Sequence, residues 1–154
     1  MLNQFLAKGL RDVFLGGNWT TVNIKETIED IDWQQANKKI DDLHSIAELL
    51  FHINYFIVAV LNVLRNEGLN AHDKFSFDQP AMQFEQDWKE LIKVTLNNAT
   101  SCAEEIENLD NTILEATFVD VKYGSYLRNI SGIIEHTHYH LGQISLIKKI
   151  LSNN

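Results

Sequence analysis

Apolar residues return every three to four positions in four long stretches of the chain, which is the period of an amphipathic α-helix. The scarcity of proline supports this interpretation, because Pro80 is the only proline and proline interrupts helices. The four stretches cover residues 2–14, 45–68, 80–109 and 125–151. The pattern therefore predicts an all-α protein with four long helices.

Residues at the ends of these stretches favour helix boundaries. The first stretch stops at Gly16-Gly17, and glycine is typical just after a helix C-terminus. Pro80 suits the beginning of the third helix, because its missing N–H needs no partner there. Ser125 is a typical N-cap for the fourth.

The connecting segments are expected to be short helices or irregular chain. Two short helices are predicted between the first two long ones, with Asn23 and Asp32 near their beginnings. Residues 70–79 are polar and mixed, which predicts a loop, and residues 110–123 are irregular with some extended structure around 116–119.

No repeat or proline-rich linker divides the chain, so residues 1–154 are expected to form one domain. Hydrophobic residues make up 45 % and charged residues 22 %, which is the globular range. Four amphipathic helices with helical crossovers and no clear set of strands predict an antiparallel four-helix bundle around one core.

Charge and hydropathy exclude several kinds of partner. The formal net charge of -8 repels phosphate backbones, so no nucleic-acid partner is expected. The most hydrophobic run, residues 56–61, is far shorter than the ~20 residues of a membrane span. The first residues lack the apolar core of a signal peptide, and the single Cys102 allows no internal disulfide. We therefore expect a cytoplasmic protein without a membrane partner.

Histidines cluster within the fourth helix. His136 and His140 are four residues apart, which places both imidazoles on one helical face about 6 Å apart along the axis. That spacing allows two rings of one helix to bind one metal ion. His138 points away from this pair. The same face carries Ile133 and Ile144, so the pair is expected to face the core, where an imidazole needs a polar partner or a metal.

A third ligand would have to come from another helix. His52 is the best candidate, because it lies mid-helix in the second stretch on the same flank as Leu49 and Phe56. His44 precedes that helix and His72 lies in the loop, so both are poorer candidates. The alternative is that these histidines are structural, each hydrogen-bonded to a carbonyl group.

Three further positions have two interpretations. Gly132 and Gly142 lie inside the predicted fourth helix, where glycine costs about 1 kcal/mol against alanine, so each indicates close packing of a neighbour or an opening towards a ligand. Cys102 falls on the apolar stripe of the third helix, which favours a buried small hydrophobe over a reactive thiol.

Two segments, residues 45–53 (SIAELLFHI) and 136–144 (HTHYHLGQI), resemble the signature stretches of the DinB-like (YfiT-like) superfamily. The resemblance implies an up-down-down-up bundle, a zinc or nickel ion on His52, His136 and His140, and a homodimer. It also implies a bacterial protein, since members include metal-dependent transferases that use bacillithiol or mycothiol, and a mycothiol-dependent maleylpyruvate isomerase.

Three imidazoles without a fourth protein ligand are typical of a catalytic rather than a structural metal site. The sequence thus favours a metal-dependent enzyme of the thiol S-transferase or hydrolase type, acting on a small molecule such as a low-molecular-weight thiol. The alternative is a non-catalytic metal- or ligand-binding module. Glu48 and Gln143 are candidates for orienting ligands. Glu48 also completes a capping box with Ser45, which is the interpretation we favour for it.

Overall fold

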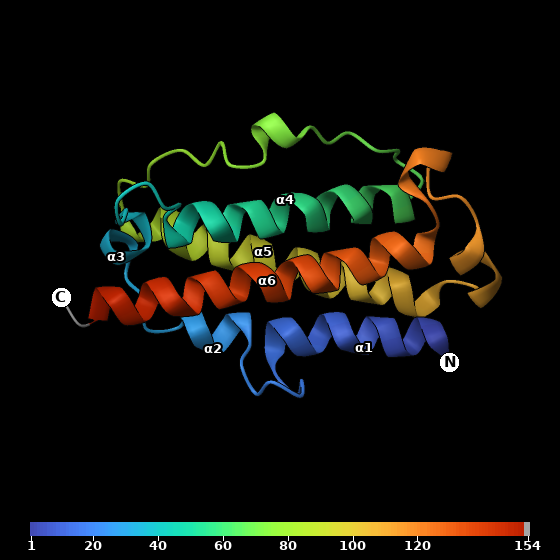
Figure 1. The fold of residues 1–154 in the computed structure, drawn as a ribbon, viewed down its shortest axis with the longest axis horizontal. Coiled ribbons are helices and arrows are strands. Elements are labelled where there is room, and N and C mark those ends of the chain that lie inside the picture. Colours follow the sequence, from blue (N-terminus) through green and yellow to red (C-terminus); the bar gives the residue numbers. More distant parts are fainter. Residues whose placement is uncertain (153–154) are drawn as a thin grey trace.

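The computed structural model describes residues 1–152, and the regular elements of this part of the chain are all helices (Figure 1). Within these residues there is no β-strand, and the one extended pairing is an isolated bridge between Thr117 and Ser125. The prediction of an all-α protein is therefore confirmed. The body of the molecule consists of α1 (Leu2–Leu15), α4 (Ile46–Leu64), α5 (Glu85–Asn108) and α6 (Tyr126–Ser152).

Shorter helical segments join the long helices. The two short helices expected before the second long one are present, each beginning at the residue after its cap. Asn23 Oδ1 accepts from the Glu26 amide at 3.0 Å, and Asp32 Oδ1 accepts from the Gln35 amide at 2.8 Å. The segments are α2 (Ile24–Ile28), α3 (Trp33–Asn37) and the 3-10 turns η1 (Asp73–Phe75), η2 (Asn111–Glu115) and η3 (Val121–Tyr123).

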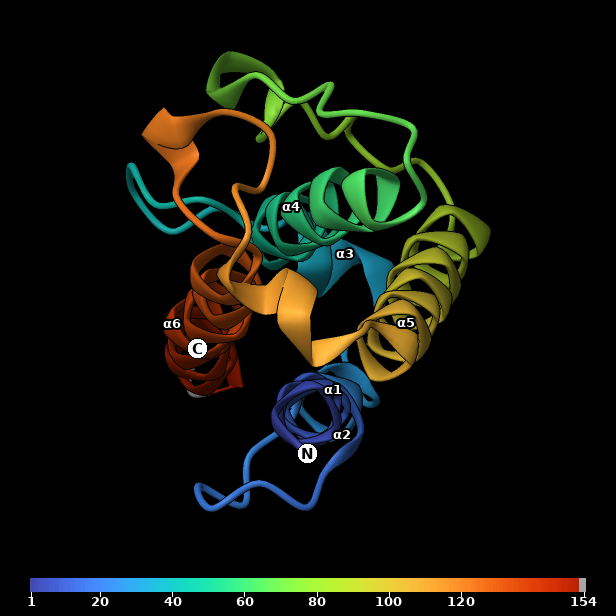
Figure 2. The ribbon, with the colours of Figure 1, turned by 90° about the vertical axis from the view of Figure 1, so that its right-hand side faces the viewer.

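The four long helices lie side by side around a shared core (Figure 2). α5 packs against α1 and α4, and α6 packs against the same two helices from the other side. α4 and α5 run in one direction, whereas α1 and α6 run in the opposite direction (Figure 1). The parallel pair requires a long return, so residues 65–84 cross back over α4 before α5 begins. This crossing segment also closes one side of the candidate site.

Capping fixes where α4 begins. Ser45 Oγ accepts from the Glu48 amide at 3.2 Å, and Glu48 Oε2 accepts from the Ser45 amide at 2.9 Å. This is the expected capping box, which satisfies two amides that the helix itself leaves without partners. The helix ends at Leu64, earlier than the predicted end near Gly68, because Asn66 and Gly68 both take positive φ values.

The beginning of α5 differs from the prediction. Pro80 lies in the crossing segment, and the helix starts at Glu85. The reason is the Asp87 carboxylate, which accepts from the Phe84 amide at 3.0 Å and so caps the helix at that point. The extended structure expected around residues 116–119 is also reduced to the one bridge, since 3-10 turns occupy most of this connection.

The core is apolar and encloses a few polar groups. Trp88 is fully buried and its Nε1–H donates to the Ile31 carbonyl oxygen at 2.7 Å. Full burial of each aliphatic or phenylalanine side chain around it contributes roughly 1.5–3 kcal/mol. Cys102 is buried in the same core, and burial raises the pKa of its thiol to about 12. The prediction that Cys102 is a buried hydrophobe is thus confirmed.

The interior glycines of α6 leave space. A Cβ atom built on Gly132 or Gly142 would meet no heavy atom within 4 Å. The alternative of close packing by a neighbour is therefore wrong for both. Gly132 instead lines a cavity, whereas Gly142 is exposed.

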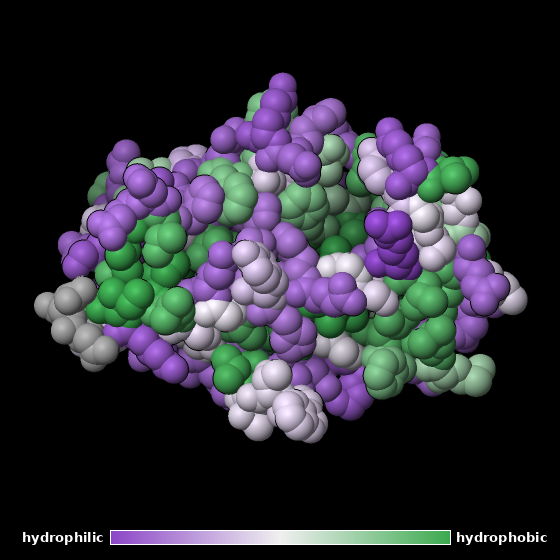
Figure 3. Space-filling view, viewed as in Figure 1, coloured by the Kyte–Doolittle hydropathy of each residue, from purple (hydrophilic) through white to green (hydrophobic). Residues whose placement is uncertain are grey.

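By length and composition α4 is apolar enough to span a membrane, which the short run at residues 56–61 did not indicate. Most of it is buried inside the molecule, as in the core helix of a soluble protein. Polar side chains also interrupt the apolar ones across the face that Figure 3 shows. The burial of α4 therefore agrees with its prediction as a core segment.

Candidate metal centre

Three histidines from two helices converge on one point. α4 supplies His52, and α6 supplies His136 and His140 one turn apart. The Nε2 atom of His136 lies 3.0 Å from that of His52 and 3.1 Å from that of His140. One nitrogen from each ring lies within 4.8 Å of the other two. The structure thus brings together the three residues that the sequence singled out.

Carbonyl oxygens set the orientation of two of the rings. His52 Nδ1 lies 3.2 Å from the Ser76 carbonyl oxygen, and His140 Nδ1 lies 2.6 Å from Gln143 Oε1. Because these oxygens can only accept, both Nδ1 atoms carry the hydrogen. In the neutral rings the lone pair is then on Nε2, and it faces the common point.

The three Nε2 atoms cannot satisfy one another as hydrogen-bond partners. A hydrogen on His136 Nε2 would have to be shared between the lone pairs of His52 and His140, and without that hydrogen three lone pairs would face each other. A divalent cation would accept all three lone pairs at once. Tetrahedral zinc, with bonds of about 2.0–2.1 Å, separates its nitrogen ligands by about 3.3–3.4 Å. Two of the three spacings here are a few tenths of an ångström below that, and the three nitrogens all lie within 4.8 Å of one another, so the three side chains could hold one metal ion.

Burial keeps the rings neutral. It lowers the pKa of His52 to about 4, an effect to which the neighbouring His140 adds. It likewise lowers the pKa of His136 to about 4, with His140 and His52 contributing, and it lowers the pKa of His140. At neutral pH the three histidines are therefore neutral imidazoles, which is the form that binds a metal ion.

Two phenylalanine rings pack against the cluster. Phe77 stacks flat on His52, with ring centroids 3.8 Å apart, and its other face stacks on His44 at 3.9 Å. Phe56 meets His52 and His136 edge-on, each at 5.1 Å. These contacts restrict the rotation of the rings, since stacked and edge-on arrangements are favourable for aromatic pairs.

The crossing segment is fixed to α4 beside the cluster. The Tyr55 hydroxyl donates to the His72 carbonyl oxygen at 3.1 Å and accepts from the His72 amide at 2.8 Å. Ser76 Oγ donates to the Asp73 carbonyl oxygen at 2.7 Å, which closes the turn. The Ser76 carbonyl is thereby directed at His52.

The cluster opens into a cavity of about 780 Å³. The walls come from α4, the crossing segment, the connection before α6, and α6 itself. All three histidines line it, together with Gly132 and the charged residues Asp73 and Arg128. A cavity of this size holds a metabolite-sized molecule, so a ligand can reach the Nε2 atoms from this side.

The other expected residues fall in different places. Glu48 caps α4 and pairs with Lys39 at 2.8 Å, and these hydrogen bonds outweigh burial, so its pKa is lowered. His138 faces away from the cluster and lines a separate cavity beside α1. His44, the poorer ligand candidate before α4, is exposed and stacks on Phe77 rather than joining the three histidines. Gln143 contacts His140 directly.

Sequence reasoning missed Ser76, Phe77 and Arg128. Each is an ordinary residue in its own segment, and only the path of the chain brings it to the cluster or its cavity. The segments around the first two are predicted loop, which carries no periodic signal that could have placed them.

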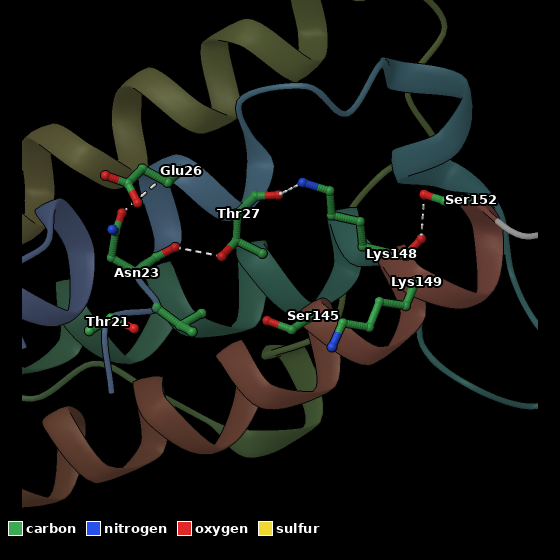
Figure 4. Close-up of a pocket in the computed structure, with 9 residues that line it drawn as sticks. Thr21, Asn23, Glu26, Thr27, Ser145, Lys148, Lys149 and Ser152 are labelled. Carbon is green, nitrogen blue, oxygen red and sulfur yellow. Dashed lines mark hydrogen bonds between the residues drawn. The ribbon is translucent and has the colours of Figure 1, made fainter. Parts of the chain in front are cut away.

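A second cavity, of about 460 Å³, lies between α2 and the C-terminal half of α6 (Figure 4). It shares no lining residue with the histidine cavity. The Lys148 ammonium beside it is already engaged, since it donates to the Thr27 carbonyl oxygen at 2.8 Å and pairs with Asp30. None of the residues that line this cavity is a histidine or a cysteine.

No family model, curated protein or solved structure matches the chain. The resemblance to the DinB-like superfamily accordingly stays a prediction, and the function is inferred from the geometry of the cluster and its cavity.

Proposed function

We propose that this protein binds one divalent metal ion, zinc or nickel, on His52, His136 and His140, and uses it to act on a small molecule. The observation that carries the proposal is the convergence of the three Nε2 atoms, two of them directed inward by hydrogen bonds at Nδ1. Imidazole suits both metals, and the ligand set alone does not select between them.

We also propose that the chain is a DinB-like four-helix bundle. Its segments 45–53 and 136–144 carry the signature residues, and they lie on the two helices that supply the histidines. The directions of the long helices, with α4 and α5 parallel and α1 and α6 opposed to them, agree with the up-down-down-up order of that superfamily. The proposed location is the cytoplasm.

The reaction we propose is the activation of a low-molecular-weight thiol or of water. A divalent ion on three neutral imidazoles lowers the pKa of a bound thiol or water, which makes a nucleophile available near neutral pH. The protein's own groups prepare this site. Gln143 and the Ser76 carbonyl hold two rings in the ligating tautomer, and Phe77 covers the side away from the cavity.

Metal analysis of tag-free protein tests the metal site. We expect one equivalent of metal per chain in the wild type and none in His136→Ala. The matched control is His138→Ala, which removes a histidine two positions along the same helix that faces away from the cluster. Full metal content in His136→Ala, or loss in both variants, would refute the ligand assignment.

The cobalt-substituted protein separates an enzyme from a binding module. If the ion has an open position, 2-mercaptoethanol should change the visible d–d spectrum of the cobalt. A spectrum that thiols leave unchanged would contradict thiol activation. The relaxation of water protons by the paramagnetic ion then shows whether the ion binds exchangeable water. A cobalt ion without exchangeable water would favour a non-catalytic module.

A further inference from the structure

Arg128 differs from the other two arginines of the chain. Arg11 of α1 pairs with Glu107 of α5, and Arg65, directly after the end of α4, pairs with Glu105 of α5. Arg128 forms no ion pair with any residue of the described range 1–152. It lies instead in the wall of the histidine cavity. An arginine in a cavity wall without an acidic partner is available to an anion from solution.

The side chain of Arg128 is held at its base. Its backbone amide donates to Ser125 Oγ at 3.2 Å, which caps α6 as the sequence predicted. Its Cδ atom lies against Gly124, so closely that a Cβ built there would be 2.9 Å away. Gly124 also has a positive φ of 77°, which favours glycine. The stem is therefore packed, although the residue as a whole is exposed.

Arg128, Gly132, His136 and His140 follow one another at intervals of four residues along α6, and all four line the cavity. At a rise of 1.5 Å per residue, the Cα atoms of Arg128 and His136 are about 12 Å apart along the helix axis. Gly132 lies between them and presents no side chain. The floor of the cavity is thus open from the arginine to the histidine cluster.

The charges of the cavity also favour an anion once the metal is bound. Asp73 is the one carboxylate among the residues that line it, and it does not pair with Arg128. The guanidinium cancels that negative charge, and a divalent ion on the neutral histidines would leave the cavity positive. On a chain with a formal net charge of -8, this cavity is a local exception.

We infer that the cavity selects small molecules with a carboxylate or similar anionic group, which Arg128 binds while the opposite end of the molecule reaches the histidine cluster. This inference rests on the proposed function and adds the substrate class to it. It assigns Arg128 the role of a specificity-determining residue rather than a metal ligand.

The test compares 6-mercaptohexanoate with 6-mercaptohexanol, which have the same chain length and end in a carboxylate and a hydroxyl group respectively. Each is titrated into cobalt-loaded protein and followed in the visible spectrum. We expect the carboxylate to bind about fivefold to tenfold more tightly. Arg128→Met should remove this preference and leave the affinity for the alcohol unchanged. Arg65→Met is the matched control, since it removes the same charge outside the cavity and should keep the preference.

Equal affinities in the wild type, or a preference that survives in Arg128→Met, would overturn the inference. Failure of the proposed function would be visible separately, as protein that takes up no cobalt. Hexanoate is then titrated into metal-free protein while the Nε–Hε resonance of Arg128 is followed by NMR. A saturable shift would support the anion site, and an unmoved resonance would overturn it.

Discussion

Alanine at Gly132 or Gly142 should stabilise the protein. Both glycines lie inside α6 with no positive φ, and a Cβ at either position would meet no heavy atom within 4 Å. No contact is lost and no clash is created, so the expected change is the helix propensity alone. Alanine is favoured over glycine in a helix interior by about 1 kcal/mol.

The two changes should add. The positions are about 15 Å apart along the helix axis, beyond the range at which substitutions usually couple. The double variant Gly132→Ala/Gly142→Ala should therefore gain about 2 kcal/mol in free energy of unfolding. For a domain of this size each kcal/mol raises Tm by roughly 2–4 °C, so the double variant should melt about 4–8 °C higher.

Urea denaturation of chelator-treated protein measures the free energy of unfolding, because bound metal would add its own stabilisation. Gly124→Ala is the opposite control. Its Cβ would lie 2.9 Å from Arg128 Cδ and its backbone has positive φ, so this variant should lose stability.

The outcome at Gly132 also bears on the cavity. If Gly142→Ala stabilises and Gly132→Ala destabilises, the space beside Gly132 is filled. That result would refute the open floor between Arg128 and the histidines, and with it the reasoning on which the anion site depends.

Three further predictions follow from the cluster and the core. Because burial holds the pKa of His52 and His136 at about 4, below 6.5 in the unfolded chain, the unfolded state binds more protons between these values. The free energy of unfolding of the metal-free protein should therefore decrease as the pH falls from about 6.5 to about 4, and a flat urea-midpoint profile would contradict this. Gln143→Ala removes the partner of His140 Nδ1 and should weaken metal affinity about 10-fold to 100-fold in a chelator competition, whereas an unchanged affinity would mean that the contact does not orient the ring. Iodoacetamide should label Cys102 only in denaturant, because burial raises the pKa of the thiol to about 12, and rapid labelling of native protein would show that the thiol is accessible.

The helices could be predicted from the sequence because their causes are local. The period of apolar positions, the capping box of Ser45 and Glu48, and the caps Asn23 and Asp32 act within a few residues. Local signals also compete, and this explains the error at Pro80. Proline is compatible with a first turn, but the carboxylate of Asp87 provides the cap that starts the helix.

Some parts of the candidate site could likewise be predicted from the sequence, and others could not. The sequence determined that His136 and His140 share one face of a helix, because the spacing of helical side chains depends on the helix alone. It could only nominate His52, since the pairing of two helices depends on packing across the whole core. The Ser76 carbonyl, the Phe77 ring and the cavity wall at Arg128 were decided by the tertiary structure. They reach the cluster through the path of the crossing segment and the packing of α6, which arise from contacts between residues far apart in the chain.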